Sequence, residues 1–264
     1  MTMTPVNFLR GMASKFPGSK ALALTALALF STAQADPLHE VFAPFESLLT
    51  SEVSDGDVNY PAFADSEAFA QMMRALATVA PSADADQATR LAFYINAYNA
   101  TSIQGILDGF SPSSVWGRLR FFKRRQYELF NTSMSLYELE HERIIAEGDP
   151  RIHFAIVCSS KSCPPLRSAL YTAAGLDSEL DAATGAFVNN PDGNSFDLET
   201  RTATLSRIFK WYGDEFAEAG GGSLAGYLAG YVKDPAVAQS LRTERWTFDY
   251  YDYDWSLNGT AIEE

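Results

Sequence analysis

Residues 149–166 read DPRIHFAIVCSSKSCPPL and hold most of the reactive side chains of the chain. Both cysteines, Cys158 and Cys163, lie here, together with His153, one of three histidines in the whole sequence. The apolar run at residues 152–157 alternates too little for a half-exposed strand and is too short for a helix that ends before two prolines. We therefore predict a buried strand, with the chemistry of the chain at its end.

Residues 1–35 have the pattern of a secretory signal peptide. Three cations precede an apolar stretch at residues 21–30, and the small residues at 33–35 form a site that a signal peptidase accepts. We predict cleavage between Ala35 and Asp36 and a periplasmic or secreted protein. The apolar stretch is about ten residues long, well short of the roughly 20 that span a bilayer, so no membrane span is expected after cleavage.

Residues 36–264 are numerous enough for a single domain with its own core. The formal net charge is −13, and the predicted leader removes only cations, so the processed chain is more acidic still. A field of this sign repels phosphate backbones and anionic lipid, so nucleic acid is not an expected partner. The basic cluster at residues 118–125, RLRFFKRR, is interpreted as a solvated edge or as an anion or substrate contact.

Helical periodicity recurs along most of the chain. Residues 37–53 and 66–79 repeat apolar side chains every three or four positions, and residues 87–107 are apolar almost all round, which is typical of a buried helix. Further helices are expected at residues 177–188, 207–218 and 223–232, a hairpin at 195–206, and a strand at 245–255 that carries Asp249, Asp252 and Asp254 outward. The pattern favours the α+β class, a helix-rich single domain packed around a small, mainly antiparallel sheet.

Two asparagines, Asn96 and Asn99, share one face of the buried helix predicted at residues 87–107. A buried carboxamide without a partner costs about 1–3 kcal/mol, so both need hydrogen bonds. They either tie loop backbone to the helix or orient a catalytic imidazole or a substrate.

Another helix begins at Ser135, which forms a capping box with Glu138. On this helix Glu140 falls near the middle of the apolar arc and His141 at its edge, so both side chains are expected to point inward. A buried carboxylate needs a proton or a partner, and an imidazole can be that partner. The alternative interpretation is an ordinary surface glutamate.

Several separate stretches of this sequence are similar to one family. They are LAFYINAYNA at residues 91–100, YELEH at 137–141, the stretch at 149–166, LSRIFKWYGDEF at 205–216 and YDWSLN at 253–258. On these stretches, spread over residues 42–258, the sequence resembles the DUF547 family. The resemblance implies a cysteine-hydrolase-like site with a Glu-His-Cys triad. A cysteine-protease-like fold is one α+β fold that could hold such a site. In this chain the triad is Glu140, then His141 or His153, then Cys158.

The two histidines differ in how they can reach Cys158. In a regular strand His153 and Cys158 face opposite sides, so contact between them requires a bulge or a bend. His141 on a packed helix avoids this problem, but its neighbour Glu140 could hardly orient it. We favour His153 slightly and keep both, the other being a core histidine bonded to backbone.

A cysteine nucleophile needs a lowered pKa, which a neighbouring imidazolium provides. Backbone N–H groups in residues 159–162 can form an oxyanion hole. This chemistry supports hydrolysis or transfer at an amide, peptide or ester bond, with no cofactor and no metal expected. No motif names the substrate or an oligomeric state, and the acidic charge argues against a strongly anionic substrate.

Three other functions fit the same residues. Cys158 and Cys163 can form a disulfide or a redox pair in an oxidising compartment, although they enclose four residues instead of the two of the C-x-x-C motif. The two cysteines with His141 and His153 are ligand types for zinc, without a recognised spacing. A non-catalytic binding domain is the third alternative.

Overall fold

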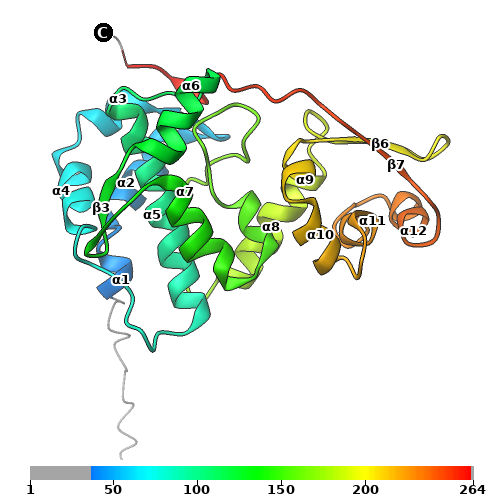
Figure 1. The fold of residues 1–264 in the computed structure, drawn as a ribbon, viewed down its shortest axis with the longest axis horizontal. Helices are drawn as coiled ribbons and strands as arrows, with labels where there is room; N and C mark the ends of the chain where they lie inside the picture. Colours follow the sequence, from blue (N-terminus) through cyan, green and yellow to red (C-terminus); the bar gives the residue numbers. More distant parts are fainter. Residues whose placement is uncertain (1–36, 263–264) are drawn as a thin grey trace, which may run out of the picture. The chain divides into compact units, whose positions relative to one another are not determined.

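Helix α5, Gln87–Leu107, runs through the first hydrophobic core (Figure 1). Its N-cap Asp86 accepts a hydrogen bond from the amide of Thr89 at 2.7 Å, and every residue from 91 to 103 is buried. An all-round apolar surface is what such a buried helix requires. Its bounds are those predicted from the sequence.

The computed structural model describes residues 37–262, which lie within the compact unit Ala35–Glu264. The predicted signal peptide falls outside the described residues. Across residues 37–262, no helix has the length and apolar character needed to cross a bilayer. The other α-helices are α1 (Pro37–Glu40), α2 (Ala43–Glu52), α3 (Tyr60–Ala64), α4 (Glu67–Ala75), α6 (Val115–Arg118), α7 (Leu136–Leu139), α8 (Leu176–Val188), α9 (Ile208–Trp211), α10 (Gly213–Ala219), α11 (Leu224–Leu228) and α12 (Pro235–Thr243). The π- and 3₁₀-helices are η1 (Leu119–Arg124), η2 (Glu140–Ile144), η3 (Ile145–Glu147) and η4 (Pro150–Phe154).

The strands are short and form three small sheets. Their orders are β1-β2-β8, β3-β4 and β5-β6-β7. Pairs that are neighbours in the chain are antiparallel, whereas β8 and β7 return from distant positions to lie parallel to β2 and β6. The predicted helix-rich α+β class is confirmed, with three small sheets in place of one. The strands are β1 (Val53–Ser54), β2 (Asp57–Asn59), β3 (Tyr127–Leu129), β4 (Thr132–Met134), β5 (Ser195–Asp197), β6 (Thr202–Leu205), β7 (Thr247–Tyr250) and β8 (Gly259–Thr260).

Two clusters of buried apolar side chains hold this unit together. The first packs α5 with α2, α3 and α4, and the second joins η4 to residues of α8–α12 (Figure 1). In the second cluster, Phe154, Phe187, Phe209 and Phe216 form a contiguous aromatic group, with contacting ring centroids 4.9–6.1 Å apart. A chain segment with its own cores can in principle fold by itself, and we expect this of the compact unit Ala35–Glu264.

Residues 152–157 are buried, but they do not form the predicted strand. Residues 150–154 are instead the 3₁₀-helix η4, and residues 155–157 join no sheet. The side chain of Asp149 accepts a hydrogen bond from the amide of Arg151 at 3.0 Å, and Pro150 takes the first helical position. Both features favour a helix start, so the strand prediction is wrong because it rested on the apolar run alone.

The segment after η4 lies where the two cores meet. Phe154 belongs to the second core, whereas Ile152 and Val157 belong to the first. The carboxamide of Asn99 donates to the carbonyl oxygen of Ala155 at 2.9 Å and accepts from the amide of Val157 at 2.8 Å. A side chain of α5 therefore makes the two backbone hydrogen bonds that a neighbouring strand would otherwise make.

The C-terminal residues 251–258, called the strap below and drawn in red in Figure 1, return across residues 158–163, called the cysteine loop. Strand β7 ends at Tyr250, not near residue 255 as predicted, because the strap bonds to the loop instead of continuing the sheet. Ser160 forms an isolated bridge with Leu257 in the strap. The amides of Lys161 and Ser162 donate to strap carbonyls at 2.9 and 3.2 Å.

The second half of the chain has shorter helices than the periodicity predicts. Tyr212 separates α9 from α10 within the single helix predicted at residues 207–218, and α11 ends at Leu228. Helix α12 was not predicted, although Asp234 caps it and a proline occupies its first turn. The three tail aspartates, Asp249, Asp252 and Asp254, are exposed as predicted.

Replacing Asn99 by alanine should destabilise the protein. The substitution leaves the buried carbonyl of Ala155 and the buried amide of Val157 without partners, so we expect the free energy of unfolding to fall by about 2–5 kcal/mol. Urea denaturation of residues 35–264 measures this. The control is Gln104→Ala, which removes an exposed hydrogen bond to Asp108 on the same helix and should change stability by under about 1 kcal/mol. Equal losses in both variants would contradict the role given to Asn99.

Candidate active site

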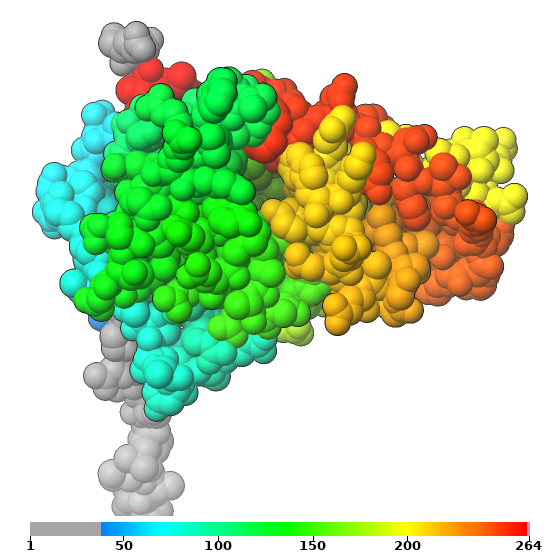
Figure 2. Space-filling model, viewed as in Figure 1, coloured from blue at the N-terminus to red at the C-terminus, as the bar shows by residue number. Residues whose placement is uncertain are grey.

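A cavity of about 600 Å³ lies beside the cysteine loop. Glu140, His141, His153, Cys158 and Cys163 of the predicted site all line it. No hydrogen bond joins the sulfur of Cys158 to either imidazole in residues 37–262. Figure 2 shows the surface hollowed between the green segments that include α7 and the gold segments that include α9. The rest of the lining is largely aromatic or apolar: Tyr98, Phe122, Lys123, Tyr137, Ile156, Pro164, Ile208, Trp211, Tyr212, Tyr253 and Trp255.

The sulfur atoms of Cys158 and Cys163 lie against each other at 2.6 Å, and both residues are free cysteines. The amide of Cys158 also donates to the sulfur of Cys163 at 2.9 Å. The loop between them turns at Ser159, whose φ of 58° is left-handed and whose hydroxyl bonds to that of Ser102 at 3.0 Å. Such a conformation costs a non-glycine residue about 1–3 kcal/mol, and it brings Cys163 back onto Cys158.

Hydrogen bonds stabilise the anionic form of Cys158. Its sulfur lies 3.1 Å from the hydroxyl oxygen of Ser160 and 3.4 Å from that of Tyr253. Burial raises the pKa of Cys158, but the hydrogen bonds from Cys163, Ser160 and Tyr253 outweigh it and leave that pKa below its ordinary value. Burial and the adjacent Cys158 raise the pKa of Cys163 well above its ordinary value. Of the two thiols, Cys158 therefore loses its proton more readily, and Cys163 is the one that can donate to the resulting thiolate.

His153 is a buried residue of η4, and a carboxylate lies within hydrogen-bonding distance of its ring. Nε2 lies 3.0 Å from a carboxylate oxygen of Glu215 on α10, and the ring stacks on Tyr212 with centroids 3.5 Å apart. Because a carboxylate only accepts, the proton of the neutral ring is on Nε2 and the lone pair is on Nδ1. Nδ1 is buried and has no hydrogen-bond partner in the described part of the chain.

His141 is partly exposed at the edge of the cavity. Its Nδ1 lies 3.0 Å from the carbonyl oxygen of Tyr137, one turn earlier, and its ring stacks on that of Tyr137 with centroids 3.8 Å apart. The carbonyl only accepts, so Nδ1 carries the proton. No acid orients this ring within residues 37–262.

Glu140 is buried but contacts neither imidazole. Its carboxylate accepts hydrogen bonds from Tyr212 at 2.6 Å and from Tyr98 at 3.3 Å. Burial and the charge of Glu140 raise the pKa of both tyrosines well above the ordinary value, so both hydroxyls stay protonated and donate. Since Tyr212 packs on His153, Glu140 acts on the imidazole only through this ring.

The two predicted supporting asparagines bond to backbone. Asn96 exchanges two hydrogen bonds with the backbone of Tyr171, at 2.8 and 2.9 Å, and Asn99 holds the segment before Cys158. Both carboxamides therefore position loops, and no hydrogen bond joins either of them to a histidine in residues 37–262.

Only part of the predicted oxyanion hole is free of bonds to the strap. The amides of Lys161 and Ser162 donate to the strap, so they cannot stabilise an oxyanion as predicted. The amides of Ser159 and Ser160 make no such bond. These two amides directly follow Cys158 in the chain, but Ser159 and Ser160 are buried and neither residue lines the cavity.

The zinc alternative finds no support in the side-chain positions. Among residues 37–262, no group of three or more histidine, cysteine or acidic side chains converges as a metal site would require. The four ligands considered for zinc, two histidines and two cysteines, line one cavity without forming such a cluster.

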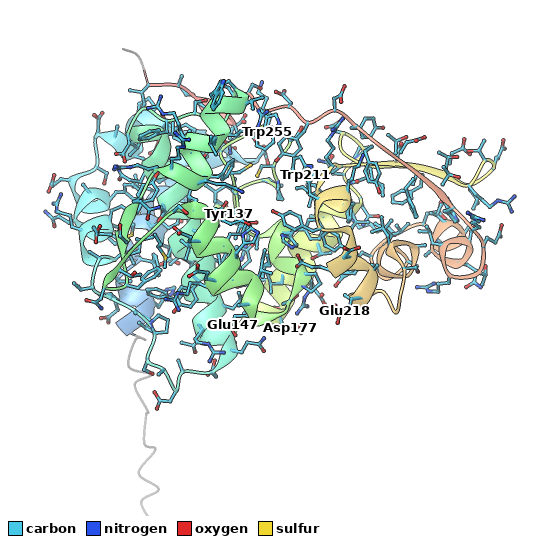
Figure 3. All side chains as sticks on the ribbon, in the orientation of Figure 1. Tyr137, Glu147, Asp177, Trp211, Glu218 and Trp255 are labelled. Atoms are coloured by element: carbon cyan, nitrogen blue, oxygen red, sulfur yellow. The ribbon has the colours of Figure 1, made fainter. Side chains whose placement is uncertain are left out.

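Trp211, Tyr253 and Trp255 form an aromatic wall at the cavity, with centroid distances of 4.4 to 5.7 Å among the three rings. Trp211 and Trp255 are labelled in Figure 3. Tyr137 is also part of the lining, and the ammonium of Lys123 lies 4.1 Å from the centroid of its ring. Flat apolar rings favour a substrate with an apolar or ring-bearing group.

Sequence reasoning missed Glu215 and Tyr253. They lie 62 and 95 residues from the site residues that they contact, His153 and Cys158. Both nevertheless fall in stretches that carry the family resemblance, LSRIFKWYGDEF and YDWSLN, and this was the available signal.

The comparison with family models finds one match. Residues 82–188 match the model described as "Protein of unknown function, DUF547". The matched region contains both cysteines, His141, His153 and Glu140, but neither Glu215 nor the strap. Comparisons with curated proteins and with solved structures gave no match.

Replacing Tyr253 by phenylalanine should raise the pKa of Cys158, because it removes a donor to the thiolate. A hydrogen bond to a charged group contributes about 1.5–3 kcal/mol, so iodoacetamide should alkylate Cys158 more slowly, by up to about tenfold, at pH values below the wild-type pKa of this thiol. Rates against pH, with the alkylated residue identified by mass spectrometry, measure the change. The matched control is Tyr251→Phe, whose hydroxyl bonds to Ser195. An unchanged pH profile in Tyr253→Phe would contradict the role of this donor.

Proposed function

We propose that this chain, whose residues 82–188 match the model of the DUF547 family, is a cysteine-dependent hydrolase or acyltransferase for amide, peptide or ester bonds. The observation that carries the proposal is the sulfur of Cys158. It lies at the wall of a cavity, within hydrogen-bonding distance of three donors that favour the thiolate. A stabilised thiolate at a cavity wall is the starting point for nucleophilic catalysis.

His153 is the proposed general base and acid, with Glu215 in the role first expected of Glu140. The carboxylate of Glu215 holds the Nε2 proton and leaves Nδ1 to take up and return a proton. Glu140 becomes a positioning residue, because it holds Tyr212 against the imidazole. His141 is not oriented by an acid, and its role in this scheme is to line the cavity.

The proposed reaction has two steps. His153 first takes up the thiol proton of Cys158 at Nδ1. The thiolate then adds to the carbonyl carbon and a C–S bond forms. The C–N or C–O bond breaks, and the leaving amine or alcohol departs with the proton from the imidazolium of His153. Water or a second acceptor then adds to the thioester, gives its proton to the imidazole, and the C–S bond breaks.

The proposed place of this reaction is outside the cytoplasm. The proposal rests on the secretory pattern of residues 1–35. In an oxidising compartment Cys158 and Cys163 can form a disulfide, and Cys158 is a nucleophile only while the pair is reduced.

A second candidate function is dithiol exchange, favoured by the 2.6 Å separation of the two sulfurs. In that reaction the Cys158 thiolate attacks a disulfide of a partner and releases one partner thiol. Cys163 then attacks the mixed disulfide, which releases the second partner thiol and leaves Cys158 joined to Cys163. The partner is reduced and the pair is oxidised.

Substitutions at the proposed triad should separate these functions. With chromogenic esters and fluorogenic peptide amides as substrates, we expect Cys158→Ala to reduce turnover by about 10³-fold or more. His153→Gln should lower kcat by about 10²–10⁴-fold, because proton transfer is lost. His141→Gln, the matched control in the same cavity, should leave kcat within about threefold. Circular dichroism and thermal melting check that each variant is folded.

Cys163→Ser distinguishes the hydrolase from the redox protein. A hydrolase keeps most of its turnover because serine still places a hydroxyl donor beside Cys158, whereas dithiol exchange loses its resolving thiol. Turnover of acyl substrates that is unaffected by Cys158→Ala would contradict the proposed function. The absence of both turnover and Cys158 labelling by acyl-directed probes would favour a binding domain.

A further inference from the structure

The helix formed by α6 and η1 exposes its most apolar residues to solvent. Val115 is 70% exposed and Trp116 is 73% exposed, against at most 46% for any other large hydrophobic residue in residues 37–262. The opposite side of this helix is anchored by Phe121, which is fully buried. The two exposed side chains are therefore held outward by a helix that is itself well packed.

The solvent-exposed side of the same helix also carries three cations. Arg120, Lys123 and Arg124 are exposed, and no carboxylate pairs with any of them in the described chain. Trp116, Arg120 and Arg124 follow at four-residue intervals, so they lie close to one side of the helix. We call the exposed set the basic-aromatic face: Val115, Trp116, Arg120, Lys123 and Arg124.

A groove beside this face is lined by guanidinium groups. Arg120, Arg124 and Arg125 surround it together with Phe110 and Gln126, over about 490 Å³. Arg125 is neutralised by Asp108 at 2.7 Å, which leaves Arg120 and Arg124 for another anion. The guanidiniums of Arg120 and Arg125 both lie over the ring of Phe110, at 5.1 and 5.6 Å, which restricts their orientation.

The negative net charge of the chain does not oppose a contact at this face. Charges farther apart than about 8 Å are largely screened at physiological ionic strength. An anion at this surface therefore interacts mainly with the cations nearest to it. The basic-aromatic face has three cations and no acid. The negative net charge is therefore compatible with a local contact between this face and anionic lipid.

We propose that the basic-aromatic face binds the surface of an anionic membrane, with Val115 and Trp116 inserted at the headgroup level and the cations on lipid phosphates. An exposed tryptophan beside unpaired arginine and lysine side chains is the combination that such interfaces favour. The protein then lies on the membrane without crossing it. Phe122 and Lys123 of the same helix line the catalytic cavity, so the contact would bring lipid close to the cavity. This inference does not depend on the proposed function.

Vesicle binding by residues 35–264 tests the inference, because this unit lacks the apolar stretch of the leader. We expect co-sedimentation with phosphatidylglycerol-containing vesicles, weaker binding as salt rises, and no binding to pure phosphatidylcholine. Arg120→Gln combined with Arg124→Gln should weaken binding by about fivefold for each cation. Trp116→Ser should weaken it by about tenfold and abolish the blue shift of tryptophan emission on vesicle addition.

Matched controls test whether location matters. Lys233→Gln with Arg245→Gln removes two exposed, unpaired cations elsewhere, and Leu198→Ser removes another exposed apolar side chain. Both should leave vesicle binding unchanged. Equal binding by the wild type and the face variants, or equal losses in the controls, would overturn the proposal. So would binding to duplex DNA that exceeds vesicle binding and is lost in the arginine variant.

Discussion

The carboxamide of Asn99 supports the buried segment on which the candidate site depends. Residues 152–157 pass between two hydrophobic cores, and no strand of the described chain pairs with them. A backbone N–H or C=O group without a hydrogen bond would destabilise the fold there. Asn99 offers one donor and one acceptor in the geometry of a peptide group, and it bonds to Ala155 and Val157. Cys158 is the next residue, so its position follows from the register of α5.

The site is assembled from parts of the chain that belong to different cores. The first core holds the segment that leads to Cys158, and the second core holds Phe216, the neighbour of Glu215 on α10. The strap crosses from one to the other and contributes Tyr253. Thiolate stability and imidazole orientation therefore both depend on how the two cores pack. A small change in that packing would act on both at once.

Charge is distributed unevenly over the described surface, and a group of cations lies beside the cavity. An acidic chain places several of its cations on one short helix, whose inner side packs through Phe121 and whose edge lines the cavity through Phe122 and Lys123. Arg118 of this helix lies over Trp255 in the aromatic wall, at 4.6 Å. Screening makes such local arrangements more important than the net charge for what the protein contacts.

The sequence alone determined the α+β class, the bounds of α5, the capping box at Ser135 and the β5-β6 hairpin, because each rests on signals within a few residues. It also identified the segment in which Cys158 and His153 lie. Tertiary structure decided that this segment is a 3₁₀-helix followed by an irregular buried stretch, and that Glu215, not Glu140, pairs with His153. Those choices depend on residues far apart in the chain that only packing brings together, and local periodicity contains no information about them.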